Sequence, residues 1–358
     1  MRALLFLLVL VPLAVLAVAC QAAPPLETPP DGGMRLTGAR IAGGEVASVT
    51  LSGDRFATVG DDGEFTGATY DLTGRWLAPA FIDAHVHLAY YAAGDELARG
   101  GVAGAVDWAA PLKSMGVRPI QVAWAGPIIT AVEGYPTQGW GRNGYGLEVA
   151  GVDAARAAVT QVRAAGATVV KVSVGAGGPD LTDAELAAIV EEAHGLGMLV
   201  GVHALSDADA RRAADAGCDI LVHAPVAALS KETVQAWAGK AVIPTISAFG
   251  GSASTRQLRE AGATVLYGTD FGNTRVLGVS ASEIEGMLDA GMTGAQILAS
   301  GTSVPAEVFG MADLGAIAVG KEASLMVLDA DPLVDPGALT RPVAVIFRGA
   351  VVAGSMPD

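Results

Sequence analysis

A pair of histidines set into an apolar run offers the clearest chemistry in this sequence. The run occupies residues 81–88, FIDAHVHL, and holds two of the five histidines of the chain. In a β-strand, side chains i and i+2 lie on the same face, about 6.6 Å apart. His85 and His87 could therefore converge on one metal ion, with Zn–N bonds of about 2.0–2.1 Å. The pair alone is equally consistent with two ordinary polar residues at a strand edge, so further ligands decide the question.

Four more polar residues stand within or at the end of strand-like apolar runs: Lys171, His203, His223 and Asp270. Each of these residues could have a structural role instead of binding a metal, because histidines can be buried without a ligand role and an aspartate can cap a helix. A lysine inside an apolar strand, however, is costly unless it is paired or neutralised. The fifth histidine, His194, falls on a predicted helix and is expected at the surface.

The elements that must position these residues alternate between strand-like runs and Ala-rich amphipathic segments from Trp76 onward. This alternation is typical of βα units with a parallel sheet. Eight runs are predicted as strands: 76–88, 103–108, 119–125, 168–174, 199–204, 219–224, 241–247 and 265–269. Predicted helices lie between the later strands: 152–165, 183–196, 207–216, 231–238 and 255–261, with Thr182 or Asp183 as the cap of the second.

Eight such units predict an α/β protein with a TIM (β/α)8 barrel, whose active groups gather at the carboxyl-terminal ends of the strands. The spacing agrees with this fold. His85 and Asp270 are 185 residues apart, or about 26 residues for each of seven βα steps. All six candidates fall at equivalent points of their units, so the sequence favours one shared site over six unrelated residues.

Short alternating segments with Gly and Pro turns flank the barrel on both sides, and we expect them to pair into one small β-sandwich domain. Before the barrel these are 34–41, 45–51, 55–59 and 69–72; after a helical stretch at 296–309 they are 315–319, 323–328 and 343–352. The predicted division of the chain is a signal peptide at 1–20, a Pro-rich tether at 21–33, the composite β domain at 34–75 plus 313–356, and the barrel at 76–312.

The N-terminus predicts export. Arg2 precedes an apolar stretch, and the segment ends in AVAC, which resembles a lipobox with Cys20 as the lipidated residue. Ordinary secretion or an uncleaved anchor is the alternative, and the run is nearly long enough to span a bilayer. A lipid-anchored protein of the bacterial cell envelope is the prediction, and Gln21 favours the outer membrane by analogy. The net charge of −15 argues against a nucleic-acid partner.

The set of six residues resembles the metal-dependent amidohydrolase superfamily: His-x-His on strand one, Lys on strand four, His on strands five and six, and Asp on strand eight. The local sequences GPIIT at 126–130, GYP at 134–136 and GKEASL at 320–325 look like the imidazolonepropionase-like group, which includes Xaa-Pro dipeptidases. The resemblance covers about residues 34–355. Ser324 stands where the family usually has Asp, and the segment 249–264 is short for the group.

The resemblance implies two divalent metal ions, with zinc as the default because imidazole and carboxylate suit it. His85, His87 and Asp270 would hold one ion and His203 and His223 the other. Lys171, as a CO2-derived carbamate, would bridge them. A hydroxide between the ions would be the nucleophile, and Asp270 would act as general base and then acid. The sequence does not distinguish zinc from Mn, Fe or Co as the bound metal.

The function predicted is hydrolysis of a C–N amide bond in a small molecule, a dipeptide or a cyclic amide. The alternatives are a lactonase or phosphotriesterase-like activity at the same site, and a non-catalytic ligand-binding lipoprotein. Candidate substrate-binding residues are Tyr135, Arg142 and Tyr145 in the Gly-rich loop after strand three, and Arg275 after Asp270. Arg142 could hold a carboxylate bidentately, or be a solvated loop arginine. The sequence predicts no oligomeric state.

Overall fold

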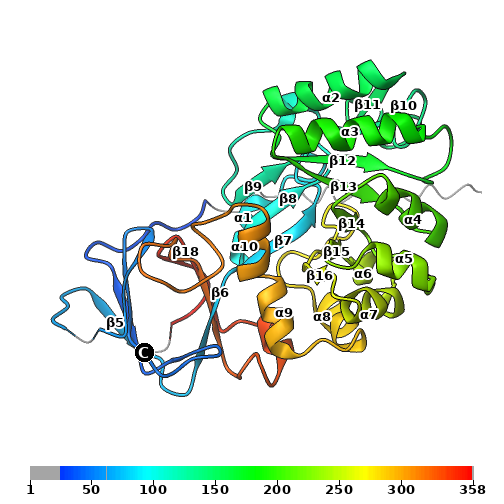
Figure 1. Cartoon of the computed structure of the whole chain (residues 1–358). Coiled ribbons are helices and arrows are strands. Elements are labelled where there is room, and N and C mark those ends of the chain that lie inside the picture. The colour runs from blue at the N-terminus through cyan, green and yellow to red at the C-terminus, as the bar shows by residue number, and fades with distance from the viewer. Residues whose placement is uncertain (1–24, 62, 357–358) are drawn as a thin grey trace, which may run out of the picture.

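The computed structural model describes residues 25–61 and 63–356 (Figure 1). The predicted signal peptide and Cys20 lie outside the described residues. Within the described part of the chain, no helix is both long and apolar enough to cross a bilayer. Figure 1 shows a unit of two small sheets beside a larger unit of parallel strands covered by helices.

The two-sheet unit is built from both ends of the described chain. One sheet has the order β4-β3-β1-β5 and the other β19-β18-β17-β6-β2. The first sheet comprises β1 (Met34–Thr37), β3 (Val49–Ser52), β4 (Arg55–Val59) and β5 (Ala68–Asp71). The second comprises β2 (Arg40–Ile41), β6 (Trp76–Pro79), β17 (Leu325–Leu328), β18 (Ala344–Phe347) and β19 (Ala350–Gly354). Buried residues of both sheets, among them Leu36, Phe56, Leu77 and Ile346, form one apolar cluster.

The larger unit has a TIM-barrel-like α/β arrangement in which every neighbouring strand pair is parallel. A three-stranded sheet joins β7 (Phe81–Val86), β8 (Val102–Asp107) and β9 (Gln121–Trp124). A seven-stranded sheet has the order β11-β10-β12-β13-β14-β15-β16. Its strands are β10 (Ile128–Ala131), β11 (Gly146–Val149), β12 (Val169–Ser173), β13 (Leu199–His203), β14 (Ile220–Val222), β15 (Ala241–Ile243) and β16 (Thr264–Val265).

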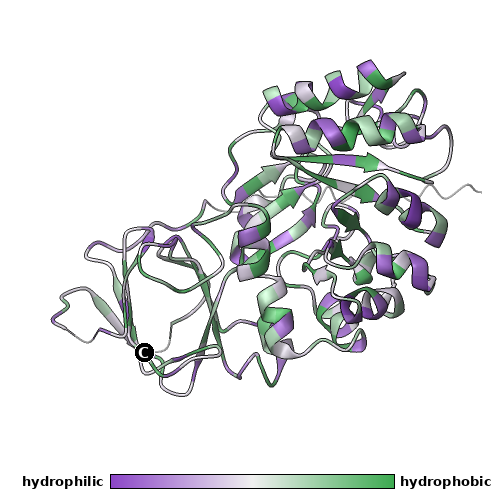
Figure 2. Cartoon of the chain, in the orientation of Figure 1, coloured by the Kyte–Doolittle hydropathy of each residue, from purple (hydrophilic) through white to green (hydrophobic). Residues whose placement is uncertain are grey.

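Helices cover these strands on the outside, and the helices in Figure 2 carry both hydrophilic and hydrophobic residues. Their bounds are α1 (Gly94–Arg99), α2 (Val152–Ala164), α3 (Asp183–Gly195), α4 (Asp207–Asp215), α5 (Lys231–Ala236), α6 (Ile246–Phe249), α7 (Ser252–Glu260), α8 (Ala281–Asp289), α9 (Gly294–Ser300) and α10 (Ser303–Val308). The predicted cap Thr182 is confirmed. Its side chain accepts a hydrogen bond from the Glu185 amide, and the Glu185 carboxylate accepts one from the Thr182 amide. His194 is exposed and pairs with Asp219 at 2.9 Å.

Several predicted elements are corrected by the structure. The run 76–88 is two strands in different sheets, so the first segment of the two-sheet unit extends to Pro79 rather than residue 75. The run 241–247 ends as a strand at Ile243, because Pro244 donates no amide, and α6 begins at Ile246. Residues 315–319 form no strand.

Two longer stretches are also interrupted. The segment 343–352 is a hairpin, β18 and β19, that turns at Arg348 and Gly349, both with positive φ. The helical stretch 296–309 is two helices broken near Gly301. A Cβ on Gly301 would lie 2.4 Å from the Phe81 ring, so glycine permits this close approach of α9 to β7.

Candidate metal centre

The candidate ligands occupy the carboxyl-terminal parts of parallel strands. His85 is in β7, Lys171 in β12, and His203 ends β13. His223 follows β14 directly. Asp270 stands in the segment after β16, which runs beside β7: the Ala84 amide donates to the Tyr267 carbonyl and the His87 amide to the Phe271 carbonyl. All of these candidate side chains are buried.

Three of them meet at one point. His85 Nε2 lies 3.3 Å from His87 Nε2, and Asp270 Oδ1 lies 3.4 Å and 3.0 Å from these two nitrogens. Around an ion with bonds of about 2.0–2.1 Å, tetrahedral ligand atoms stand about 3.4 Å apart. The three ligand atoms lie within 4.8 Å of one another, a separation that suits one divalent ion.

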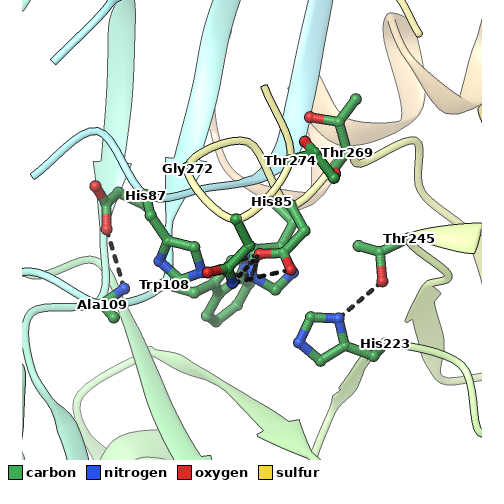
Figure 3. Close-up of polar contacts among 12 residues, drawn as sticks. His85, His87, Trp108, Ala109, His223, Thr245, Thr269, Gly272 and Thr274 are labelled. Atoms are coloured by element: carbon green, nitrogen blue, oxygen red, sulfur yellow. Dashed lines mark hydrogen bonds and ion pairs between the residues drawn. The ribbon is translucent and has the colours of Figure 1, made fainter. Parts of the chain in front are cut away.

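His203, His223 and Lys171 stand next to this group. The His223 ring centroid lies 4.6 Å from that of His85 and 5.0 Å from that of His203. His223 Nδ1 is hydrogen-bonded to Thr245 Oγ1 at 2.7 Å, as Figure 3 shows, so its Nε2 is the nitrogen left for a ligand. The Lys171 amine lies 5.6 Å from the Trp108 ring centroid.

Burial sets the protonation of these groups. It lowers the pKa of His203 to about 3, and it lowers the pKa of His85 and His223 well below the ordinary value, with nearby cationic groups adding to the effect. Burial also lowers the pKa of Lys171 to about 7, opposed by Asp270. The imidazoles are therefore neutral, the form that binds metal. With this pKa a substantial part of the Lys171 amine is unprotonated at neutral pH, and the unprotonated amine is the form that reacts with CO2.

Buried groups behind the ligands hold their geometry. Asp83 accepts hydrogen bonds from the His85 amide (3.1 Å), the Thr269 amide (3.0 Å) and the Thr269 hydroxyl (2.5 Å), and so ties β7 to the segment that carries Asp270. Among the described residues, Nδ1 of both His85 and His87 has no hydrogen-bond partner.

Three supporting residues were missed from the sequence. Asp107 ends β8 and accepts from the Ala89 and Ala109 amides at 2.9 and 3.0 Å; burial raises its pKa to about 6, against an attraction to His87. Asn273 donates to both oxygens of Asp270, at 3.2 and 3.1 Å. Thr245 holds His223. Only Asp107 had a signal, since it ends a predicted strand as the ligands do.

Strained backbone marks the same place. His223, Thr245 and Asp270 have φ of 89°, 47° and 56°, in the region that L-residues rarely adopt. Such residues cost about 1–3 kcal/mol each and cluster at functional sites.

The four candidate substrate residues differ in their surroundings. Tyr145 donates its hydroxyl to the Ala89 carbonyl at 2.9 Å. Tyr135 stacks on His203 with ring centroids 5.4 Å apart. Arg142 is exposed and donates to the Gln138 carbonyl at 3.1 Å. Arg275 lies over the Tyr91 ring at 4.5 Å and donates to the Gly272 carbonyl. Of the four, Tyr135 thus contacts a predicted ligand directly, and both arginines are engaged within the chain.

Residues 76–356 match the profile of the Amidohydrolase family. The chain belongs to this family. As an amidohydrolase it is a hydrolase acting on carbon–nitrogen bonds, and the family binds divalent metals. No curated protein sequence matches this amidohydrolase.

Solved structures similar to this amidohydrolase share its fold. One is a Xaa-Pro dipeptidase with bound methionine, 22% identical, covering 89% of this chain and 99% of its own, with a TM-score of 0.74. A second is a putative prolidase from Bifidobacterium longum, 24% identical, covering 93% and 97%, with a TM-score of 0.74. A third is the A. niger ochratoxinase, 20% identical, covering 90% and 96%, with a TM-score of 0.69.

Proposed function

We propose that this amidohydrolase cleaves an amide bond in a small molecule, a dipeptide or a cyclic amide, at a site for two zinc ions. The observation that carries the proposal is the convergence of His85, His87 and Asp270 on one point, with their ligand atoms 3.0–3.4 Å apart. His203, His223 and a carbamate on Lys171 would hold the second ion. The fit rests on neutral imidazoles and on a buried amine whose pKa is about 7.

The residues of the chain have distinct tasks in such a reaction. Bound divalent ions would supply a water of lowered pKa and polarise the scissile carbonyl. Asp270 takes a proton from the attacking water and delivers it to the leaving nitrogen, and Asn273 fixes the direction of its carboxylate. Asp83 and Thr245 hold the ligands so that little reorganisation is needed.

A pocket that shares Tyr135 and Trp140 with the surroundings of the site supports a small substrate. A pocket of about 480 Å³ is lined by Tyr135, Pro136, Trp140 and Pro179, among others. This volume lies within the range of small-molecule sites. Similar structures are described as a Xaa-Pro dipeptidase and a prolidase, which favours dipeptides among the amides. We include Tyr135, Tyr145, Arg142 and Arg275 in the substrate-binding region.

The test is a panel of dipeptides, N-acyl amino acids, cyclic amides and lactones, assayed with protein loaded with Zn²⁺ and bicarbonate. Turnover of one amide class supports the proposal. Turnover confined to lactones or phosphotriesters would instead assign the alternative hydrolase activity. No turnover, with less than one metal ion per chain, would leave the non-catalytic alternative.

We also propose that the two parallel sheets are parts of one (β/α)8 barrel beside a small β-sandwich. The edge strand β9 contacts β12 through the Thr168 amide and the Trp124 carbonyl at 2.9 Å. The segment after β16 reaches β7 through Ala84 and Tyr267 at 2.8 Å. These bonds support a closed ring of strands.

Localisation is a proposal from the sequence alone: an exported protein anchored in the cell envelope by a lipid on Cys20. Incorporation of labelled palmitate should disappear in the Cys20→Ala variant. Incorporation that survives this change would remove Cys20 as the site.

A further inference from the structure

A buried glutamate of α8 holds the short helix α6. Glu283 is fully buried, and its two carboxylate oxygens accept hydrogen bonds from consecutive amides of α6, that of Ile246 at 3.0 Å and that of Ser247 at 2.7 Å. Burial raises the pKa of Glu283 to about 7, and these two bonds oppose the rise. The two helices also pack closely, since a Cβ on Gly286 of α8 would lie 2.4 Å from Ile246 Cγ2. Hydrogen bonds and packing together therefore fix α6 on α8.

Both ends of α6 contact the ligands proposed for the second ion. Thr245, directly before the helix, is hydrogen-bonded to His223 Nδ1 at 2.7 Å (Figure 3). Phe249, the last residue of the helix, packs on the same imidazole with ring centroids 4.4 Å apart, and its ring lies 6.5 Å from that of His203. A shift of α6 would therefore move a hydrogen-bond partner and a packing surface of these ligands at once.

The residue that stands at the N-cap of α6 is engaged elsewhere. In α3, α4, α5, α8 and α9 the N-cap Ser or Thr accepts a hydrogen bond from an amide of its own helix, but Thr245 does not. Its hydroxyl donates to the Pro244 carbonyl at 2.8 Å and accepts from His223. Glu283 supplies the missing acceptor from 37 residues further along the chain than Ile246. Because a helix of four residues has little stability of its own, its position depends on this acceptor.

The start of α8 is in turn anchored to the segment that carries Asp270. The Ser280 hydroxyl accepts from the Glu283 amide at 3.2 Å, and the Ser280 amide donates to the Tyr267 hydroxyl at 2.7 Å. Tyr267 stands three residues before Asp270, and its carbonyl accepts from the Ala84 amide of β7 at 2.8 Å. Glu283 therefore lies at the junction between the strands proposed to hold the first ion and the helix that contacts the ligands of the second.

We propose that Glu283 is a positioning residue for the candidate metal centre. By accepting from the α6 amides in place of Thr245, it leaves the Thr245 hydroxyl available to orient His223, and it sets the position of the second ion relative to the first. It acts on the ligands through Thr245 and Phe249. This inference rests on the proposed function, because it requires a site for two ions.

Glu283→Gln tests the role because it keeps the length of the side chain and one acceptor oxygen, but turns an NH2 group toward one of the two α6 amides. We expect affinity for the second Zn²⁺ ion to fall by about 10–100-fold, as on loss of a group that orients a ligand. Affinity for the first ion should stay within about threefold of the wild type. Competition with a chelator, on the full chain loaded with Zn²⁺ and bicarbonate, measures both affinities.

Glu185 provides a matched control. It is also buried, and its carboxylate also accepts from two backbone amides, that of Thr182 at 2.8 Å and that of Gly151 at 2.6 Å, but at the start of α3. Glu185→Gln should lower the melting temperature as Glu283→Gln does, and leave affinity for both ions within about threefold of the wild type. With Co²⁺ in place of Zn²⁺, the visible absorption of the second ion reports its ligand geometry and should change in Glu283→Gln alone.

Two further variants test the route of the effect. Thr245→Val combined with Glu283→Gln should lose less second-ion affinity than the two single effects added together, since both act through the same hydroxyl. Glu283→Asp keeps the charge on a shorter side chain and should lose more than about threefold in that affinity. Fully additive effects in the double variant would contradict action through Thr245.

The outcomes separate this role from the proposed function. A wild type that binds two ions, with a folded Glu283→Gln variant within about threefold of it in second-ion affinity, overturns the positioning role alone. Equal losses of that affinity in Glu283→Gln and Glu185→Gln would make the effect one of general stability and overturn it too. If Glu283→Gln does not fold, unchanged second-ion affinity in Glu283→Asp overturns the role. A wild type that binds fewer than two ions overturns the proposed site and the role together.

Discussion

The hydroxyl of Thr245, which is not a candidate ligand, positions one of the candidate ligands. The Thr245 hydroxyl donates to the Pro244 carbonyl at 2.8 Å and therefore accepts from His223 Nδ1, 2.7 Å away; Thr245 has φ of 47°. The bond fixes which imidazole nitrogen is free, and such outer partners orient ligands in metal sites. Thr245, whose backbone is in the left-handed region, thus holds the candidate ligand His223 in place.

Thr245→Val removes this hydroxyl and keeps a branched side chain of similar size. We expect affinity for the second metal ion to fall by about 10–100-fold, measured by competition with a chelator. Thr245→Ser keeps the hydroxyl and should stay within about threefold of the wild type. Equal affinities in Thr245→Val and the wild type would show that the bond does not position His223.

The buried thiol of Cys218 predicts how the free energy of unfolding depends on pH. Burial raises the pKa of Cys218 from 9.0 to about 12, so the folded protein keeps a proton that the unfolded chain loses. The free energy of unfolding should therefore fall as pH rises from about 9 toward 12, by about 1.4 kcal/mol per pH unit.

In a Cys20→Ala background, Cys218 is the only cysteine. A thiol reagent at pH 8 should label it only after unfolding in urea; rapid labelling of the native protein would contradict its burial.

At the scale of elements, two segments far apart in the sequence are locked together beneath the site. Asp83 in β7 accepts three hydrogen bonds, two of them from Thr269. Asp71, at the exposed end of β5, accepts hydrogen bonds from the amide and the hydroxyl of Thr73, as Asp83 does from those of Thr269. The chain therefore contains a matched control for the effect of burial.

Asp83→Ala leaves three buried donors without an acceptor, and should lower the free energy of unfolding by about 3–5 kcal/mol. Asp71→Ala exposes its donors to water and should cost less than about 1 kcal/mol. Urea denaturation measures both. Similar values for the two variants would mean that the link between β7 and the Asp270 segment contributes little.

The sequence predicted the strands around the site, because β7, β8, β12, β13 and β14 are buried on both faces and so appear as continuous apolar runs. Other elements lacked that signal. In β11 the sequence GLEV is mostly half-exposed, and α1 has only six residues. Asn273 could not be predicted, since its role depends on a loop conformation that brings an amide to Asp270.

At the scale of the whole molecule, the chain passes from the two-sheet unit into the site within a few residues. β6 pairs with β17 in the five-stranded sheet and leads directly into β7. The position of the candidate ligands on and directly after β7 therefore depends on a sheet in which three of the other four strands, β17, β18 and β19, come from the far end of the chain. We expect the two units to unfold together.

Leu77→Ala tests this dependence. Leu77 is fully buried between the two sheets, and its truncation should cost about 2–5 kcal/mol. Val334→Ala, 83% exposed, should change stability by less than about 0.5 kcal/mol. Thermal unfolding should stay a single transition in Leu77→Ala. Two separated transitions would show that the units are independent.

Six residues, on or directly after the four strands β7, β12, β13 and β14 and in the segment after β16, form the proposed site for two metal ions. The direct measurement is metal content per chain, by elemental analysis, after loading with Zn²⁺ and bicarbonate. The wild type should bind two ions, and Lys171→Ala should lose one of them together with most of the activity. Two ions retained in Lys171→Ala would contradict the bridging role, and less than one ion in the wild type would contradict the site.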